Sequence, residues 1–358
     1  MPNVKSSPED YIGYTDKNDY AEKLEQQIAQ YVDYGDMQQL PPSYFHWGIG
    51  SFFPGFYDVY GPVDIHEFFA KPFMEGADNQ QRPRFLSIGC GDGTVEIGVA
   101  QKLIDSGLAD SEFVCADLSP VLLERFEANL KPEMRSLFIL RAVDLNQMDS
   151  GIAGEFNGVM ASHSLHHLVE LDRIFRWVKR VLKPGGTFAI NDMIGRNGHM
   201  RWPETGQFVQ MLWPLLNDRQ RYNVLLKRLY DVFEDHDCST FGFEGIRAQD
   251  ILPLLLINFY PKRFFATGGL IDPFIDRGFG FGFDVSNEKD KTLLDFISKL
   301  NDVLLDAGQI KPTLMLAYFV KEPCEEKFFR MRSAKACVRE PTTDLGWTAA
   351  YPQIVVGP

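Results

Sequence analysis

Apolar positions between residues 84 and 192 follow two alternating spacings. Short apolar runs predict five strands, near residues 84–88, 112–116, 136–141, 156–161 and 186–191. Apolar residues at helical spacing predict helices between them, near residues 93–106, 119–130 and 170–182. Strands that alternate with helices in this way are typical of βαβ units, so we expect an α/β fold with a doubly wound, mostly parallel sheet.

The pattern changes on both sides of this core. Upstream, residues 19–33 predict an amphipathic helix, and the aromatic-rich residues 41–73 are expected to form an irregular layer over the core or over a ligand. Downstream of residue 192 the alternation breaks, and helical patterns near residues 203–235 and 247–258 predict an inserted cap.

Two closing strands are expected near the end of the core. They fall at residues 261–267 and 313–321, separated by the glycine-rich residues 278–283 and a helix with an apolar stripe over residues 293–304. Residues 322–358 show no clear period and are expected to be a loosely packed tail. The expected organisation is an N-terminal helical and aromatic lid (1–80), a ligand-binding core (81–194), a helical insertion or cap (195–260), closing strands with an inserted helix (261–321), and a tail (322–358).

Composition narrows the function classes. Of 358 residues, 36 are Lys or Arg and 49 are Asp or Glu, a net charge of −13, which repels nucleic acid backbones. The five cysteines are scattered without a C-x-x-C pair, so we expect neither disulfides nor a metal site. Residues 1–20 are polar and lack the pattern of a secretory signal. The most apolar stretch, residues 251–260, is half as long as the ~20 residues that a membrane-spanning helix needs. We therefore expect a cytoplasmic protein without membrane contact.

A glycine-rich loop follows the first expected strand. Residues 89–93 read Gly-Cys-Gly-Asp-Gly and lead into a helix, so the backbone can approach a ligand closely where no Cβ stands in the way. A dinucleotide fingerprint needs a glycine at position 94, where the chain has Thr94. The spacing disfavours a nicotinamide dehydrogenase, while a tight strand-to-helix turn without a ligand remains an alternative explanation.

Two acidic residues end the next two expected strands. Asp117 ends the second strand, where a carboxylate can accept the hydroxyl protons of a ribose. Asp144 and Leu145 follow the third strand, where an acid beside an apolar residue suits an adenine amino group and ring face. Either acid alone could instead be a helix cap or a solvated strand end.

Together these motifs resemble the class I S-adenosylmethionine-dependent methyltransferases of the small-molecule type. The resemblance rests on residues 88–93, Asp117, Asp144–Leu145, the Ser-Leu-His-His of 164–167 and the Leu-Lys-Pro-Gly-Gly of 182–186. It implies a seven-stranded sheet of order 3-2-1-4-5-7-6 with the seventh strand antiparallel, and S-adenosylmethionine along the carboxyl ends of strands 1 to 4. The implied cofactor contacts are Gly89, Cys90, Gly91, Asp117, Leu118, Asp144, Leu145 and Ser162. One departure is Ser87, where the family usually has Asp or Glu.

The segment after the fourth strand carries the candidate chemistry. His163, His166 and His167 follow Ser162, and Asp192 ends the fifth strand. Histidine titrates near neutral pH and can take a proton from an attacking hydroxyl or ammonium, and a carboxylate can orient the ring. Methyltransferases with a Leu-His-His segment use such a pairing, as the resemblance implies. The alternative is that these histidines only cap the strand and pack against the next helix.

The sequence therefore predicts methyl transfer to an oxygen or nitrogen of a small molecule, either a secondary metabolite or a sugar-like compound. A homodimer is one assembly that we consider for the enzyme. The Asn- or Asp-Pro-Pro-aromatic motif of enzymes that methylate nucleic acid amines is absent at residues 162–164. A non-catalytic S-adenosylmethionine-binding or scaffold protein and, less favoured, an NAD-dependent oxidoreductase remain as alternatives.

Overall fold

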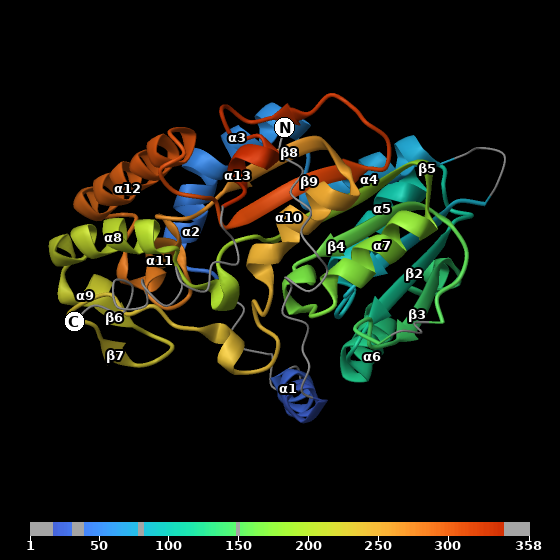
Figure 1. Ribbon diagram of the computed structural model, residues 1–358, viewed down its shortest axis with the longest axis horizontal. Helices are drawn as coiled ribbons and strands as arrows, with labels where there is room; N and C mark the ends of the chain where they lie inside the picture. Colours follow the sequence, from blue (N-terminus) through green and yellow to red (C-terminus); the bar gives the residue numbers. More distant parts are fainter. Residues whose placement is uncertain (1–16, 31–38, 78–81, 148–150, 340–358) are drawn as a thin grey trace, which may run out of the picture.

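A computed structural model describes residues 17–30, 39–77, 82–147 and 151–339 (Figure 1). Its centre is an eight-stranded sheet of order β10-β8-β9-β5-β4-β1-β2-β3. The strands are β1 (Arg84–Ile88), β2 (Glu112–Asp117), β3 (Phe138–Ala142), β4 (Phe156–Ser162), β5 (Leu182–Met193), β8 (Tyr260–Thr267), β9 (Leu314–Val320) and β10 (Lys327–Phe328). β9 is antiparallel to both of its neighbours, and the other pairs are parallel.

The doubly wound α/β class is therefore confirmed. The expected order 3-2-1-4-5-7-6 is confirmed for seven strands of this sheet, with β8 as the expected sixth strand and β9 as the expected seventh. The expected number of strands is wrong. An eighth strand, β10, pairs in parallel with β8 at the sheet edge. Only two residues long, it carries no period that could be recognised in the sequence.

Helices cover both faces of the sheet because its strands are apolar on both sides. Leu86 and Ile88 of β1 pack on one face with α7 (Leu171–Val181) and α10 (Ala248–Asn258). Phe85 points to the opposite face, where it packs with α3 (Phe53–Tyr60), α4 (Ile65–Gly76) and α5 (Thr94–Asp105). Successive side chains on a strand alternate between faces, which produces this division.

The aromatic segment near the N-terminus is helical rather than irregular, which corrects the expectation for residues 41–73. It forms α2 (Pro42–Trp47), a π-helical turn η2 (Gly48–Phe52), α3 and α4. Pro42 and Pro54 lie in the first turn of α2 and α3, where a missing backbone N–H breaks no helical hydrogen bond. The prolines therefore start these helices instead of interrupting them.

A cap with its own apolar cluster lies at one end of the molecule, away from β2 and β3 (Figure 1). It contains α8 (Pro203–Leu212), α9 (Asp218–Arg221), the hairpin β6 (Tyr222–Asn223) and β7 (Arg228–Leu229), α11 (Asp272–Ile275) and α12 (Glu288–Asp306). Two insertions thus build it, one after β5 and one after β8. Trp47 of α2 joins the same cluster.

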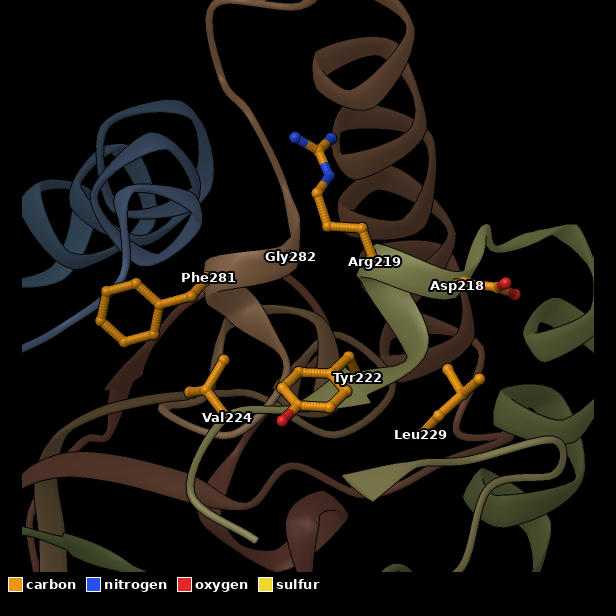
Figure 2. Close-up of a pocket in the computed structure, with 7 residues that line it drawn as sticks. All are labelled: Asp218, Arg219, Tyr222, Val224, Leu229, Phe281 and Gly282. Atoms are coloured by element: carbon orange, nitrogen blue, oxygen red, sulfur yellow. The ribbon is translucent and has the colours of Figure 1, made fainter. Parts of the chain in front are cut away.

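The hairpin replaces the helical pattern expected as far as residue 235. The side chain of Asn223 accepts hydrogen bonds from the backbone N–H groups of Leu225 and Leu226, and Lys227 has a φ of 51°. Local bonds of this kind compete with helix formation. The hairpin borders a hollow of about 370 Å³ in which Val224 lies between Tyr222 and Phe281 (Figure 2).

The remaining elements are short or peripheral. They are α1 (Lys17–Gln30), α6 (Pro120–Asn129), α13 (Ala334–Cys337), and the turns η3 (Pro132–Leu137), η4 (Leu165–His167), η5 (Asn197–His199), η6 (Trp213–Leu215), η7 (Cys238–Thr240) and η8 (Gly280–Gly282). Residues 322–339 are packed rather than loose, since Arg332 is buried and donates hydrogen bonds to Asp302 and Asp306 of α12. Within the described ranges no helix is both long and apolar enough to cross a bilayer.

Candidate active site

The glycine loop between β1 and α5 combines tight packing with one open face. Gly89, Gly91 and Gly93 all have positive φ, at 67°, 55° and 75°. A Cβ at Gly89 would lie 2.4 Å from that of Ser164, and one at Gly93 would lie 2.3 Å from the ring of Phe126. A Cβ at Gly91 would meet nothing within 4 Å. Packing therefore requires the outer glycines, while the middle one presents bare backbone to open space.

Asp117 lies directly beside this open backbone. Its Oδ2 accepts a hydrogen bond from Gly91 N at 2.7 Å, and its Oδ1 accepts one from Ser119 N at 2.8 Å. Burial raises the pKa of Asp117, against the lowering effect of these backbone hydrogen bonds. A carboxylate has about four lone-pair positions, so acceptor capacity remains for the hydroxyl groups of a ligand.

Asp144 lies at the next corner of the same sheet edge. The N–H of Val143 donates to the carbonyl of Asp117 at 2.8 Å, which joins the two corners. Asp144 Oδ2 accepts a hydrogen bond from the hydroxyl of Tyr20 at 2.6 Å, so α1 reaches this edge. Leu118 is half-buried beside Asp117, whereas Leu145 is buried in the apolar core.

A carboxyl group from α5 lies beside Ser87. Ser87 Oγ donates to Glu96 Oε1 at 2.6 Å, and both side chains are fully enclosed under the glycine loop. Burial raises the pKa of Glu96 to about 7. Glu96 was not recognised from the sequence because the family motif places its acid on the strand.

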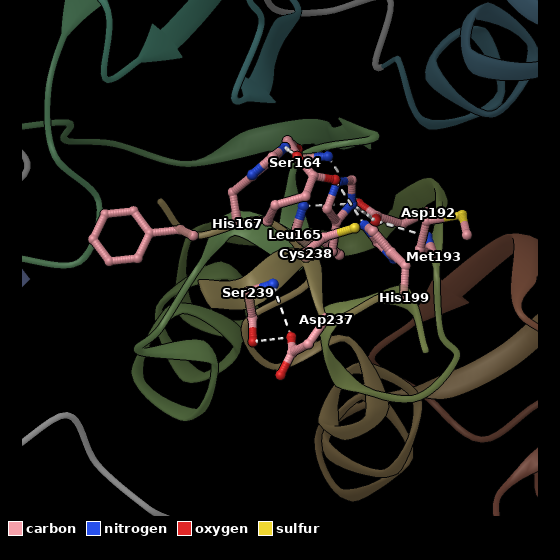
Figure 3. A network of polar contacts seen from close by, with 12 residues as sticks. Ser164, Leu165, His167, Asp192, Met193, His199, Asp237, Cys238 and Ser239 are labelled. Carbon is pink, nitrogen blue, oxygen red and sulfur yellow. Dashed lines mark hydrogen bonds and ion pairs between the residues drawn. The ribbon is translucent and has the colours of Figure 1, made fainter. Parts of the chain in front are cut away.

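Asp192 organises the loop that follows β4. Its Oδ2 accepts hydrogen bonds from the N–H groups of Ser164 and Leu165 at 2.9 and 2.7 Å, and its Oδ1 lies 2.5 Å from Nδ1 of His166 (Figure 3). Burial alone would raise the pKa of Asp192, but the charge of His166 and these hydrogen bonds lower it to about 2. The structure thus brings together the predicted His and Asp pair, with the carboxylate positioning the whole loop.

His166 is enclosed between two carboxylates. Its Nδ1 faces Asp192, and its Nε2 lies 3.4 Å from Oε1 of Glu244. Burial alone would lower the pKa of His166, but the two carboxylates raise it to about 10. In this state the ring is protonated at neutral pH and has no lone pair with which to accept a proton.

His163 differs from His166 in exposure and in protonation. It follows Ser162 at the end of β4, has a φ of 50°, and is exposed on the loop. Desolvation lowers the pKa of His163, which favours the neutral form of its ring. Burial, followed by the charge of His166, lowers the pKa of His167 to about 3.

Two residues at this site were not predicted to take part in the chemistry. His199 lies in the turn after β5, and Glu244 lies in the cap segment before α10. His199 Nε2 is 2.7 Å from Glu244 Oε1. Two backbone hydrogen bonds, from Gly198 N to Gly245 O and from Ile246 N to His166 O, hold the segment around Glu244 in place. The second bond joins this segment to the loop of residues 163–167, here called the histidine loop. His199 and Glu244 are 45 positions apart in the chain, so no local sequence pattern could predict their contact.

The carboxyl edge of β1 to β4 therefore carries an open glycine loop, two acids and a histidine loop, the arrangement of a nucleoside-binding methyltransferase core. Residues 86–188 match the family described as "Methyltransferase domain". This segment is a class I S-adenosylmethionine-dependent methyltransferase domain, as the motifs indicated, and the cofactor of the family is S-adenosylmethionine. The match sets aside the NAD-dependent alternative.

Particular relatives cover different parts of the chain. An uncharacterized methyltransferase, sll0829, of Synechocystis sp. (strain ATCC 27184 / PCC 6803 / Kazusa) is 27% identical over 161 residues, 41% of this chain and 70% of that protein. Sterol 4-C-methyltransferase strm-1 of Caenorhabditis elegans is 32% identical over 117 residues, 32% of each protein. Among solved structures, the plantazolicin methyltransferase BpumL in complex with SAH has a TM-score of 0.38 and 13% identity, covering 85% of this chain and 97% of that one.

Proposed function

We propose that this protein transfers the methyl group of S-adenosylmethionine to an oxygen or nitrogen of a small molecule, with His163 as the proton acceptor. The observation that carries the proposal is the placement of an accessible imidazole on the loop after β4, next to a glycine loop whose central residue faces open space. Ser164 joins the two loops, since its Oγ donates to the carbonyl of Ile88 at 2.6 Å.

The residues at the sheet edge fit the cofactor. The bare backbone at Gly91 permits the close approach of a ligand, and Asp117 and Asp144 supply carboxylates at successive corners. Together with Gly89, Cys90, Leu118, Leu145 and Ser162 they would hold S-adenosylmethionine. When bound, the cofactor supplies a methyl group on a positively charged sulfur, which is a good leaving group.

The histidine loop then has two tasks. His163 accepts the proton that an acceptor hydroxyl loses as it attacks, or that an ammonium loses before its nitrogen can attack, a step that contributes about 10²- to 10⁴-fold in rate. Asp192 and His166 act as positioning residues, since the carboxylate fixes the backbone of Ser164 and Leu165 as well as the ring. His167 packs against His166, with ring centroids 4.2 Å apart, and supports the same arrangement.

The cap favours a small acceptor. Its segment around Glu244 is bonded directly to the histidine loop, and α1 lies over the neighbouring corner, so protein surrounds the reacting edge. The net charge of −13 opposes a polyanionic substrate. A secondary metabolite or a sugar-like compound with a hydroxyl or amino group agrees with these features.

The test is a methyl-transfer assay with labelled S-adenosylmethionine and a panel of small hydroxyl and amine acceptors. With an acceptor in hand, His163→Ala is expected to lower kcat by about 10²- to 10⁴-fold, the contribution of a general base, and to leave cofactor affinity within threefold of the wild type. His236→Ala, a histidine in the cap outside this loop, is the matched control. Unchanged turnover in His163→Ala would contradict the assignment, and absence of transfer to every acceptor class would contradict the proposed activity.

A further inference from the structure

The side chains of His166, His199 and Glu244 converge from three separate segments. One ligand atom from each lies within 4.8 Å of the other two. His166 is in the turn after β4, His199 is in the turn after β5, and Glu244 is in the cap segment before α10. We propose that these three residues bind a divalent first-row transition-metal ion.

The distances between the ligand atoms agree with coordination to a single ion. Glu244 Oε1 is 3.4 Å from His166 Nε2 and 2.7 Å from His199 Nε2. In a tetrahedral site with bonds of about 2.0 to 2.2 Å, neighbouring ligand atoms are roughly 3.3 Å apart. The ion would take the place of the proton on His166 Nε2, which is released on binding, and a small outward shift of His199 or Glu244 would make room for it.

The outer shell is already in place around His166. Its Nδ1 is 2.5 Å from Oδ1 of Asp192, which fixes the ring with Nε2 directed toward Glu244. Histidines that bind metals usually donate their other ring N–H to a carboxylate or carbonyl in this way. Asp192 is itself held by the N–H groups of Ser164, Leu165 and Met193.

The backbone also holds His199 in an unusual conformation. Its φ is 56°, a region that non-glycine residues seldom adopt, and such outliers concentrate at functional sites. The hydrogen bond from Gly198 N to Gly245 O ties this turn to the segment that carries Glu244. This hydrogen bond therefore fixes His199 and Glu244 relative to each other.

The three proposed ligands differ in their exposure to solvent, and Glu244 is the most exposed. Side-chain exposure rises from 6% at His166 to 17% at His199 and 33% at Glu244, so the group is open on the side of the cap segment. Three protein ligands with an open position are typical of reactive rather than structural metal centres. Two imidazole nitrogens and one carboxylate favour zinc, iron or cobalt over magnesium or calcium.

The sequence predicted no metal site because the three ligands are 33 and 45 positions apart and match no local ligand spacing. His167 is a neighbour of the group, with its Nε2 3.8 Å from Glu244 Oε2. The inference depends only on these side chains and not on the identity of the methyl acceptor.

The test is metal binding by the full-length protein after treatment with a chelator. Titration with Co²⁺ is expected to give a visible absorption band that saturates at one equivalent, and Zn²⁺ is expected to displace it, with both ions followed by equilibrium dialysis and metal analysis. His199→Ala should weaken Co²⁺ binding by about 100-fold because it removes one of three ligands, and Glu244→Gln should weaken it by about 10- to 100-fold because a neutral amide oxygen replaces a charged carboxylate.

His46→Ala is the matched control, since His46 also pairs with a carboxylate, Asp295 at 2.7 Å, but lies outside the group. It should bind Co²⁺ like the wild type. Circular dichroism and S-adenosylhomocysteine binding check that each variant is folded. Equal Co²⁺ affinity in folded Glu244→Gln and wild type, or no binding by the wild type, would overturn the inference, and neither result would bear on methyl transfer itself.

Discussion

Glu96 places a carboxyl group in the apolar layer beneath the glycine loop. Burial has the largest effect in raising the pKa of Glu96, the charges of Asp117 and Asp92 raise it further, and the hydrogen bond from Ser87 offsets only part of this. The side chain therefore favours the protonated form in the folded protein, with a pKa of about 7 against 4.5 for an ordinary glutamate. This residue gives the glycine loop a support whose charge depends on pH.

Replacing Glu96 by Gln is expected to change how stability depends on pH. Because the folded pKa is raised, the folded wild type binds more protons than the unfolded chain between pH 4.5 and 7, and its stability falls as pH rises through this window. The loss amounts to about 3 kcal/mol at pH 8 relative to pH 4.

Urea unfolding of wild type and Glu96→Gln at pH 5 and pH 8 measures this effect. The variant should be the more stable of the two at pH 8, and its stability should change less between the two pH values. Glu124→Gln, an exposed glutamate on α6, is the control and should follow the wild type. A variant with the same pH dependence as the wild type would show that Glu96 does not titrate in this way.

At the scale of elements, α1 depends on a few side chains to reach the sheet edge. Tyr20 donates to Asp144, and Lys23 donates to the carbonyls of Ser239 and Gly242 in the cap. Burial, followed by the hydrogen bond to Asp144, raises the pKa of Tyr20, so its hydroxyl remains a donor. The helix thereby links the adenine corner of the expected cofactor site to the segment before Glu244.

Tyr20→Phe removes the bond to Asp144 and leaves the ring. A hydrogen bond to a charged group contributes about 1.5 to 3 kcal/mol, so amide hydrogen exchange in α1 is expected to speed up by roughly tenfold or more. Hydrogen–deuterium exchange with mass spectrometry resolves this helix. Tyr57→Phe, an exposed tyrosine on α3, should leave the exchange of α1 unchanged. Identical exchange of α1 in Tyr20→Phe and wild type would mean that other contacts hold the helix.

Elements with a strong apolar period were predictable, and those held by single polar bonds were not. The expected strand at residues 84–88 coincides with β1, because Phe85, Leu86 and Ile88 are apolar and residues 85–88 are all buried. The hairpin at 222–229 was missed because Asn223 directs the turn through its side chain. The helices α2 and α3 were not predicted because prolines, which often interrupt helices, lie in their first turns. In the site, the glycine loop and the two acids could be predicted because they follow the ends of predicted strands. Glu96, His199 and Glu244 could not be predicted, because only tertiary packing brings them to their partners.

At the scale of the whole molecule, three layers meet at the carboxyl edge of the sheet. The core supplies the glycine loop and acids, two insertions supply the cap (Figure 1), and α1 contacts the turn after β3 through Tyr20. The matched methyltransferase segment spans residues 86–188, and both α1 and the elements of the cap lie outside it. We therefore expect the cap and α1 to determine which acceptor enters, and the core to determine cofactor affinity.

Calorimetric titration of the protein with S-adenosylhomocysteine, in wild type and Asp117→Ala, tests the cofactor site most directly. The wild type is expected to bind one equivalent, and Asp117→Ala is expected to lose on the order of 100-fold in affinity, since a hydrogen bond to a charged group contributes about 1.5 to 3 kcal/mol. Asp105→Ala, on the exposed side of α5, should bind like the wild type. No binding by the wild type, or equal binding by Asp117→Ala, would contradict the assignment of this edge as the cofactor site.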